Sequence, residues 1–343
     1  MRITGKVLFT GLIISFPLLV FNCQNPKKAD PIKIGLIVTQ TDVNNPNYVA
    51  EKERVDAAKL AIEEINKNGG VFGREFELII KDSHNSIPFT LKAARDIIHE
   101  GAVAIVGPQT SAQLMAVADS VTIKNGVVII SPSATASAIG QMKSDTNNTV
   151  FRTCPSDEFQ GKIASEYLKE KNIKTAAIIY IDNAYGQGLS ESFSKRFTLK
   201  GKITTSVPFP SEAEDNQQFD FNPFVTKVLN GNPEAVYIVS SLEGAKIIKD
   251  ISKYIADKKL KTPFLMGCDG NYDERMLNNT DKKFAEGMIG TAPANSKNDR
   301  NFSKFAKNFK NKFQYDVKSA WAATTYDAVY LIAYACACLA WVV

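Results

Sequence analysis

The sequence is poor in the residues on which enzymes most often rely. Its 343 residues include only two histidines, His84 and His99, and its five cysteines form no C-x-x-C pair. Zinc and thiol-redox sites built on such motifs are therefore not indicated. The G-x-S-x-G motif of hydrolases, the H-E-x-x-H motif of zinc proteases and the P-loop are also absent. We accordingly expect no catalytic site, no metal and no cofactor.

An excess of one charge sign is lacking as well. The chain carries 41 Lys and Arg against 36 Asp and Glu, a net charge of +5, and the two signs alternate along it. Because no basic block occurs, the sequence gives no indication of a nucleic-acid-binding track. A hydrophobic content of 44% with 22% charged residues is typical of a folded soluble protein, and the length suffices for two domains.

The N-terminal apolar run is too short for a confident membrane span. After two basic residues, a nearly unbroken apolar run of 15 residues covers 7–21 and leads to Asn22-Cys23. This pattern predicts a signal peptide over 1–22, and a cysteine at this place resembles a lipoprotein signal. We expect lipidation at Cys23 and a polar tether over 23–30, although Asn22 is an unusual residue before such a cysteine. The alternatives are an ordinary signal peptide and an uncleaved anchor.

The C-terminal apolar run has 16 uncharged residues, 328–343, and contains several tyrosines. It is short for a membrane span, and we interpret it as half of a buried helix. From this ending we expect that a C-terminal segment is missing.

The most informative stretch lies between residues 103 and 137. It contains two β-branched runs, 103–106 and 127–130. Each run is followed by a turn rich in small residues and hydroxyl groups, at 107–111 and 131–135. Residues 112–124, between the two runs, have helical character. Turns at the carboxyl ends of parallel strands are where α/β sheets bind ligands, and a helix N-terminus attracts an anion. The turns therefore predict two walls of a carboxylate pocket. The alternative is a helix N-cap beside an ordinary loop.

The same alternation of strand and helix runs through the chain twice. Apolar runs that predict strands begin at residues 32, 76, 103 and 127, and again at 175, 203, 235 and 263. Strands that alternate with helices indicate parallel sheets covered by helices. We therefore predict an α/β protein with two Rossmann-like lobes, a hinge and a central ligand cleft, the first lobe comprising 31–152 and 275–343 and the second 153–274.

The cysteines and histidines leave alternatives open. Cys154 and Cys268 could form a disulfide in an export compartment or remain buried free thiols. His84 follows a predicted strand at the ligand edge, where it could serve as the base of a serine hydrolase, contact the ligand, or be a solvated loop residue.

Five segments together resemble a known family. They are VAIVGPQTS, VVIISPSATAS, FRTCPSDEFQG, AAIIYIDNAYGQGL and FLMGCDGNYDE, in this order along the chain. They resemble the branched-chain amino-acid binding proteins, which are periplasmic binding proteins of the type I fold that serve ABC importers. The resemblance implies a monomeric, extracytoplasmic protein, anchored to the membrane through its lipid, that binds an amino acid and delivers it to an ABC permease.

The resemblance also implies roles for individual residues. Ser111 would help to hold the ligand carboxylate, while Ser133, Ala134 and Thr135 would hold the carboxylate and the ammonium. Tyr185 would close over the ligand from the second lobe. Asp269, where relatives often have glutamate, would pair with the ammonium.

Some features depart from the family pattern. Ser240-Ser241-Leu242 stands where relatives often have an aromatic wall, so a related small carboxylate or amide is an alternative ligand. An exported two-lobed sensor or receptor domain is the alternative function.

Overall fold

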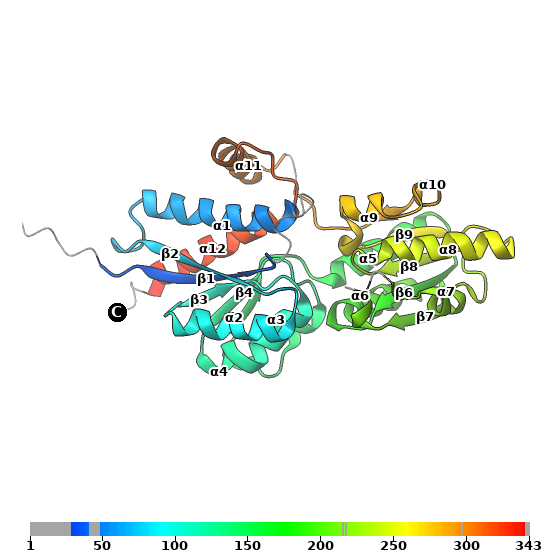
Figure 1. Ribbon diagram of the computed structural model, residues 1–343, viewed down its shortest axis with the longest axis horizontal. Helices are drawn as coiled ribbons and strands as arrows, with labels where there is room; N and C mark the ends of the chain where they lie inside the picture. Colours follow the sequence, from blue (N-terminus) through cyan, green and yellow to red (C-terminus); the bar gives the residue numbers. More distant parts are fainter. Residues whose placement is uncertain (1–28, 41–48, 215, 217, 296–297, 340–343) are drawn as a thin grey trace, which may run out of the picture.

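The chain folds into two α/β lobes, each built on a five-stranded parallel sheet (Figure 1). The fold is described from a computed structural model, which describes residues 29–40, 49–214, 216, 218–295 and 298–339. The predicted signal peptide and Cys23 lie outside the described residues. The predicted fold class is confirmed.

The first sheet has the strand order β2-β1-β3-β4-β5. Its strands are β1 (Ile32–Val38), β2 (Phe76–Asp82), β3 (Ala104–Val106), β4 (Val128–Ser131) and β5 (Val150–Arg152). Its helical elements are α1 (Val49–Lys67), α2 (Ile87–His99), α3 (Ser111–Val117), the π-helical η1 (Ala118–Thr122), α4 (Ile123–Asn125), the 3₁₀ turn η2 (Ser137–Gln141), α11 (Arg300–Phe313) and α12 (Ala320–Leu339). The first lobe thus joins residues before 153 to residues after 299.

The second sheet has the order β10-β9-β8-β6-β7. Its strands are β6 (Thr175–Ile181), β7 (Lys202–Phe209), β8 (Ala235–Val239), β9 (Phe264–Gly267) and β10 (Ile289–Gly290). Its helical elements are α5 (Asp157–Glu170), α6 (Ala184–Phe197), η3 (Ser211–Ala213), α7 (Asn222–Leu229), α8 (Gly244–Lys258), η4 (Asp269–Asn271), α9 (Glu274–Asn278) and α10 (Lys282–Ala285). The second lobe is therefore one continuous segment.

The two sheets have the same topology. In the first sheet β2 lies at one edge, β1 lies next to it and β3 lies on the other side of β1. In the second sheet β7, β6 and β8 take the corresponding places. The strand order therefore reverses between β1 and β3 in the first lobe and between β6 and β8 in the second. In sheets of this kind ligands bind at that reversal, beyond the carboxyl ends of the strands.

Alternate residues of each strand supply separate cores on the two faces of the sheet. In β6, Ile178 packs with α5 and α6, whereas Ile179 packs with α7 and α8. In the first lobe α1 and α12 cover one face and α2 and α3 the other (Figure 1). Strands buried on both faces are apolar throughout, which explains why runs such as Ile32–Val38 were recognisable in the sequence.

Helix α12 is long and apolar enough to cross a membrane by length and composition. In this fold it packs along α1 and the first sheet, and Ala328, Val329 and Ile332 are buried in that core. The interpretation of this run as a buried helix agrees with these contacts, although Leu331 and Tyr334 on its outer face are exposed.

The expected return to the first lobe at residue 275 is wrong. Helices α9 and α10 pack on α8, and β10 pairs with β9 through Ile289 and Met266. The chain therefore stays in the second lobe to Gly290 and crosses back before α11.

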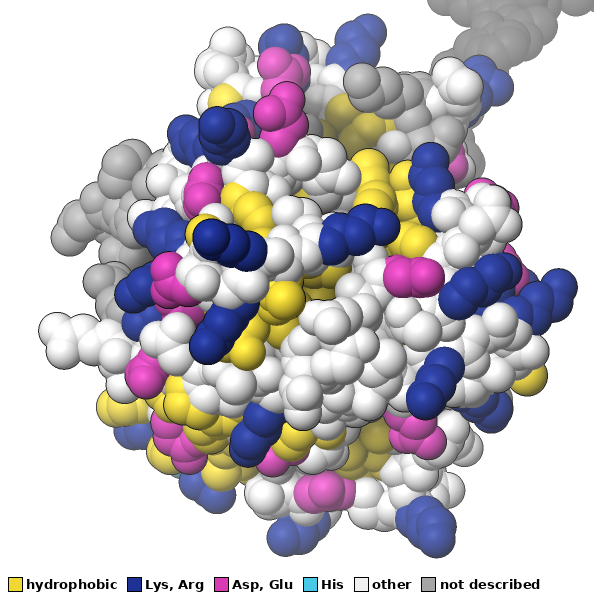
Figure 2. Space-filling model, turned by 90° about the vertical axis from the view of Figure 1, so that its right-hand side faces the viewer, with side chains coloured by type: hydrophobic (Ala, Val, Ile, Leu, Met, Phe, Trp, Pro, Cys, Tyr) yellow, Lys and Arg dark blue, Asp and Glu magenta, His cyan; other side chains and the backbone are white. Residues whose placement is uncertain are grey.

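The end of the second lobe has a mixed surface. Figure 2 shows Lys and Arg side chains interspersed with Asp and Glu, with small hydrophobic patches between them. Such a mixture is typical of a solvated surface rather than of a continuous basic track.

Candidate functional site

The two turns predicted to bind a carboxylate form one unit in the first lobe. The Ser111 Oγ accepts a hydrogen bond from the Ala136 N–H at 3.1 Å, and the Ser133 Oγ donates to the Gln109 carbonyl oxygen at 2.8 Å. As an acceptor in the first contact, the Ser111 hydroxyl keeps its own hydrogen for a further partner. The Thr110 side chain also caps α3. The first turn therefore serves as a helix N-cap and is at the same time hydrogen-bonded to the second turn.

The second turn is also fixed to the crossing between the lobes. The Arg152 Nη1 donates to the carbonyl oxygens of Thr135 and Ala136, at 2.8 and 2.7 Å. The Asp157 N–H, at the start of α5, donates to the Thr135 carbonyl at 2.9 Å. The turn thus contacts the start of the second lobe, and Ala134 and Thr135 within it are buried.

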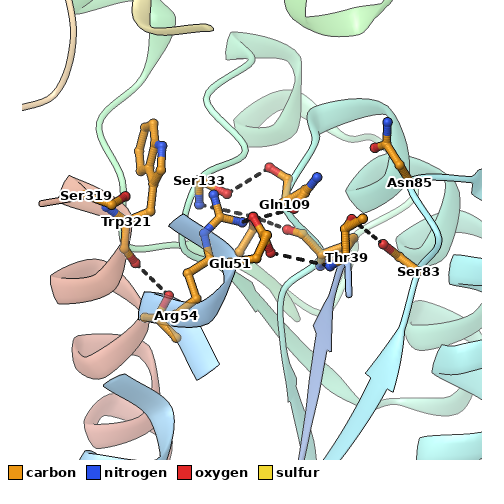
Figure 3. A network of polar contacts seen from close by, with 12 residues as sticks. Thr39, Glu51, Arg54, Ser83, Asn85, Gln109, Ser133, Ser319 and Trp321 are labelled. Carbon is orange, nitrogen blue, oxygen red and sulfur yellow. Dashed lines mark hydrogen bonds and ion pairs between the residues drawn. The ribbon is translucent and has the colours of Figure 1, made fainter. Parts of the chain in front are cut away.

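A network of polar side chains adjoins the first turn at the reversal of strand order (Figure 3). The Thr39 and Ser83 hydroxyls, at the ends of β1 and β2, lie 2.8 Å apart. The Arg54 Nη1 lies 3.0 Å from a Glu51 oxygen and 3.3 Å from the Gln109 side-chain oxygen. Figure 3 shows these side chains converging above the strand ends, with Trp321 of α12 nearby.

Glu51 and Arg54 form a buried ion pair in the first turns of α1. Their side chains are 9% and 7% exposed. Burial raises the pKa of Glu51, and the Arg54 charge opposes that rise. The sequence did not indicate this pair, because an acid and a base three residues apart on a helix usually belong to a solvated face.

The second lobe brings Tyr185 and Asp269 together. The Tyr185 hydroxyl, in the first turn of α6, donates to the Asp269 Oδ1 at 2.6 Å, and the Gln160 Nε2 donates to the same oxygen at 3.0 Å. Asn183 caps α6 by accepting hydrogen bonds from Tyr185 N–H and the next N–H. The two predicted second-lobe residues thus share one hydrogen-bonded cluster at the end of the sheet.

The electrostatics of this cluster are those of a half-buried acid with hydrogen-bond donors around it. Burial raises the pKa of Asp269, and the hydrogen bonds from Tyr185 and Gln160 oppose the rise. Burial, followed by the Asp269 charge, raises the pKa of Tyr185. A cation that enters here would face a carboxylate with little water around it, which strengthens their attraction.

Asp157 is a site residue that the sequence interpretation missed. The N-cap of α5 is Ser156, and Asp157 is the first helical residue. Its carboxyl group is fully buried, and the charge of Asp269 acts on it. A second acid therefore stands beside the predicted one.

Comparison with known proteins places this geometry in a family. The family model described as periplasmic binding protein matches residues 31–337. The chain belongs to the periplasmic binding protein family. The family resemblance seen in the sequence motifs is thereby confirmed.

This periplasmic binding protein is similar in sequence to two bacterial proteins. It is 32% identical over 207 residues to the Leu/Ile/Val-binding protein BraC3 of Rhizobium johnstonii, an alignment that covers 60% of this chain and 53% of that protein. The matched segment thus spans about half of that relative. A second relative is the leucine-, isoleucine-, valine-, threonine-, and alanine-binding protein of Pseudomonas aeruginosa. This chain is 28% identical to it over 307 residues, which cover 89% of this chain and 78% of that protein.

The fold is also that of a solved family member. The substrate-binding protein LivJ of Streptococcus pneumoniae, in complex with isoleucine, is 25% identical and superposes with a TM-score of 0.71, over 89% of this chain and 83% of that one. Membership of the family implies a location outside the cytoplasm and a binding role.

Cys154 and Cys268 of this periplasmic binding protein are free thiols rather than a disulfide. Cys154 and Cys268 are both unpaired and buried, and burial raises the pKa of each to about 12. Thiols of this kind are poor nucleophiles and poor metal ligands.

The His84 side chain has no nucleophile as a hydrogen-bond partner in the described part of the chain. Its ring lies 4.7 Å from the Phe89 ring, its Nδ1 is 3.7 Å from the Asp82 Oδ2, and the side chain is 42% exposed. No serine hydroxyl bonds to it among the described residues, so the geometry gives a His84 base no support.

A metal site is likewise not indicated by the described side chains. No cluster of three or more His, Cys, Asp or Glu residues occurs among them.

Proposed function

We propose that this periplasmic binding protein captures a free amino acid, of branched-chain type, and delivers it to an ABC permease. The observation that carries the proposal is the pairing of opposite chemistries at the lobe junction. Hydroxyl groups beside a helix N-terminus line the first lobe at Ser111 and Ser133, and a half-buried acid lines the second at Asp269. A zwitterion presents the complementary carboxylate and ammonium.

In the proposed mechanism the first lobe receives the carboxylate. The Ser111 hydroxyl and the turn at Ser133, Ala134 and Thr135 hold it, while the hydrogen bonds of Arg152 keep the turn in place. The lobes then close, and Tyr185 and Asp269 enclose the ammonium. Closure is favoured because these second-lobe contacts form only in the closed state.

The names of the relatives support the ligand class, since they refer to leucine, isoleucine and valine. We further propose that the protein is a monomer, held at the membrane by a lipid on Cys23. Metabolic labelling with a fatty acid would test the anchor, because Cys23→Ala should abolish incorporation.

Calorimetric titration with leucine, isoleucine, valine and deaminated leucine tests the function. We expect binding of the amino acids, a large loss in Asp269→Asn, and no loss in Asp257→Asn, an exposed acid on α8 of the same lobe. Binding also stabilises the folded state, by about 2.7 kcal/mol at a hundred times the dissociation constant. If no amino acid binds, or if Asp269→Asn binds as well as the parent protein, the proposal fails.

A further inference from the structure

Asp157 is an acid that the proposed mechanism has not yet used. Its side chain is completely buried, and neither carboxyl oxygen accepts a hydrogen bond from any described residue. Burial raises the pKa of Asp157 well above its ordinary value, and the Thr135 side chain, which faces it from the first lobe, opposes the rise. A buried polar group without a partner is costly, so a role for this acid is expected.

Asp157 lies next to the acid of the predicted ammonium site. Gln160, three residues further along α5 and on the same face of that helix, donates to the Asp269 Oδ1 at 3.0 Å. Asp157 and Asp269 therefore lie near one another at the start of α5, and the Asp269 charge disfavours the charged form of Asp157.

The groups around the pair do not neutralise two negative charges. Arg152 is the cation that acts on Asp157, but its Nη1 is bound to the carbonyl oxygens of Thr135 and Ala136. No lysine or arginine among the described residues forms an ion pair with either acid. The other titratable groups that face the pair have raised pKa values and are neutral at pH 7: Tyr185, Tyr237, Cys154 and Cys268.

Two carboxyl groups in such a place cannot both be ionised without a cation. We propose that Asp157 and Asp269 share one proton in the empty protein, and that a ligand ammonium displaces this proton into solvent when the lobes close. The inference rests on the proposed function, since it takes the ligand to carry an ammonium. The ammonium supplies the positive charge that the proton supplied before.

The exchange makes capture dependent on pH. Each bound ligand releases up to one proton, so affinity rises with pH, by at most tenfold per unit, until the pair has lost its proton in the empty protein as well. At higher pH, where the empty protein has already lost the shared proton, the affinity no longer changes with pH. Acidic surroundings therefore favour release of the ligand.

Titration calorimetry with L-leucine, in two buffers of different ionisation enthalpy at the same pH, counts the protons released. We expect release of up to one proton from the parent protein and from Asp257→Asn, and none from Asp157→Asn, whose affinity should also lose its pH dependence. Infrared spectroscopy of the ligand-free parent protein should show a buried protonated carboxyl group at pH 7 that Asp157→Asn lacks.

The outcomes separate the two proposals. Leucine binding without proton release, or the absence of a protonated carboxyl group from the ligand-free protein, overturns the shared proton and leaves the proposed function intact. Failure of every amino acid to bind, with the protonated carboxyl group present, overturns the proposed function and supports the shared proton. Because both measurements use the parent protein, they decide the matter even if Asp157→Asn does not fold.

Discussion

The buried ion pair of α1 gives a prediction whose size follows from the structure. In Arg54→Met the side chain keeps most of its volume but leaves Glu51 without its positive partner. At 3.0 Å, and with an effective dielectric constant of about 20, the attraction between the two charges is about 5 to 6 kcal/mol. Loss of one member of a buried pair costs about 3–5 kcal/mol in practice, a large part of the roughly 5–15 kcal/mol that stabilises a typical folded protein.

The loss of stability in Arg54→Met should be larger at high pH than at low pH. Burial already raises the pKa of Glu51 above its ordinary value of 4.5, and removal of Arg54 takes away the charge that opposes the rise. The folded state of the variant therefore binds this proton more tightly than the unfolded chain does. The free energy of unfolding of the variant falls as pH rises from about 4.5 to the raised pKa. Relative to the parent protein, the variant should therefore be less stable at pH 8 than at pH 5.

Urea unfolding followed by circular dichroism at pH 5 and pH 8 measures this difference. Lys92→Met is the matched control, because Lys92 and Asp96 form an exposed pair on α2, whose loss should have little effect. The double variant Glu51→Gln, Arg54→Met should recover part of the stability, since it leaves no unpaired charge. A loss in Arg54→Met no greater than that in Lys92→Met at pH 8 would refute this reasoning.

Three further outcomes are expected. Tyr185→Phe removes the hydroxyl that donates to Asp269 at 2.6 Å and should weaken amino-acid binding by about ten- to a hundredfold in calorimetric titration. Gly107→Ala should lower the melting temperature, because Gly107 has φ +98° and an added Cβ would lie 2.3 Å from a carbonyl oxygen of β1. Cys154 and Cys268, whose pKa values burial raises to about 12, should react with a thiol reagent at pH 8 only after unfolding. The exposed thiol of Cys338 in α12 should react in the folded protein.

The sequence predicted the fold well where local pattern and tertiary burial agree. Ile32–Val38 was recognisable because a strand covered on both faces is apolar nearly throughout. The return to the first lobe was misplaced because β10 belongs to the second sheet through its pairing with β9, Ile289 beside Met266, and local sequence does not show which sheet a strand joins.

The candidate site was predictable only in part. The turns at Ser111 and Ser133 stood out because each follows a buried strand. Glu51 and Arg54 did not, because their burial depends on contacts with residues that are distant in the sequence. Aspartate is a good N-cap residue, and only the fold shows that Ser156 takes that position in α5 and that the Asp157 side chain is buried.

The discontinuity of the first lobe has a consequence for the order in which the chain matures. Residues 157–290 form the second lobe without a break, so this lobe can fold as soon as that stretch has emerged from the ribosome or the export channel. The first sheet emerges earlier, but one of its faces is covered by α12, whose Ala328, Val329 and Ile332 come last. The half of the protein that is made first therefore finishes folding second, and its uncovered sheet is the surface most in need of protection during biogenesis.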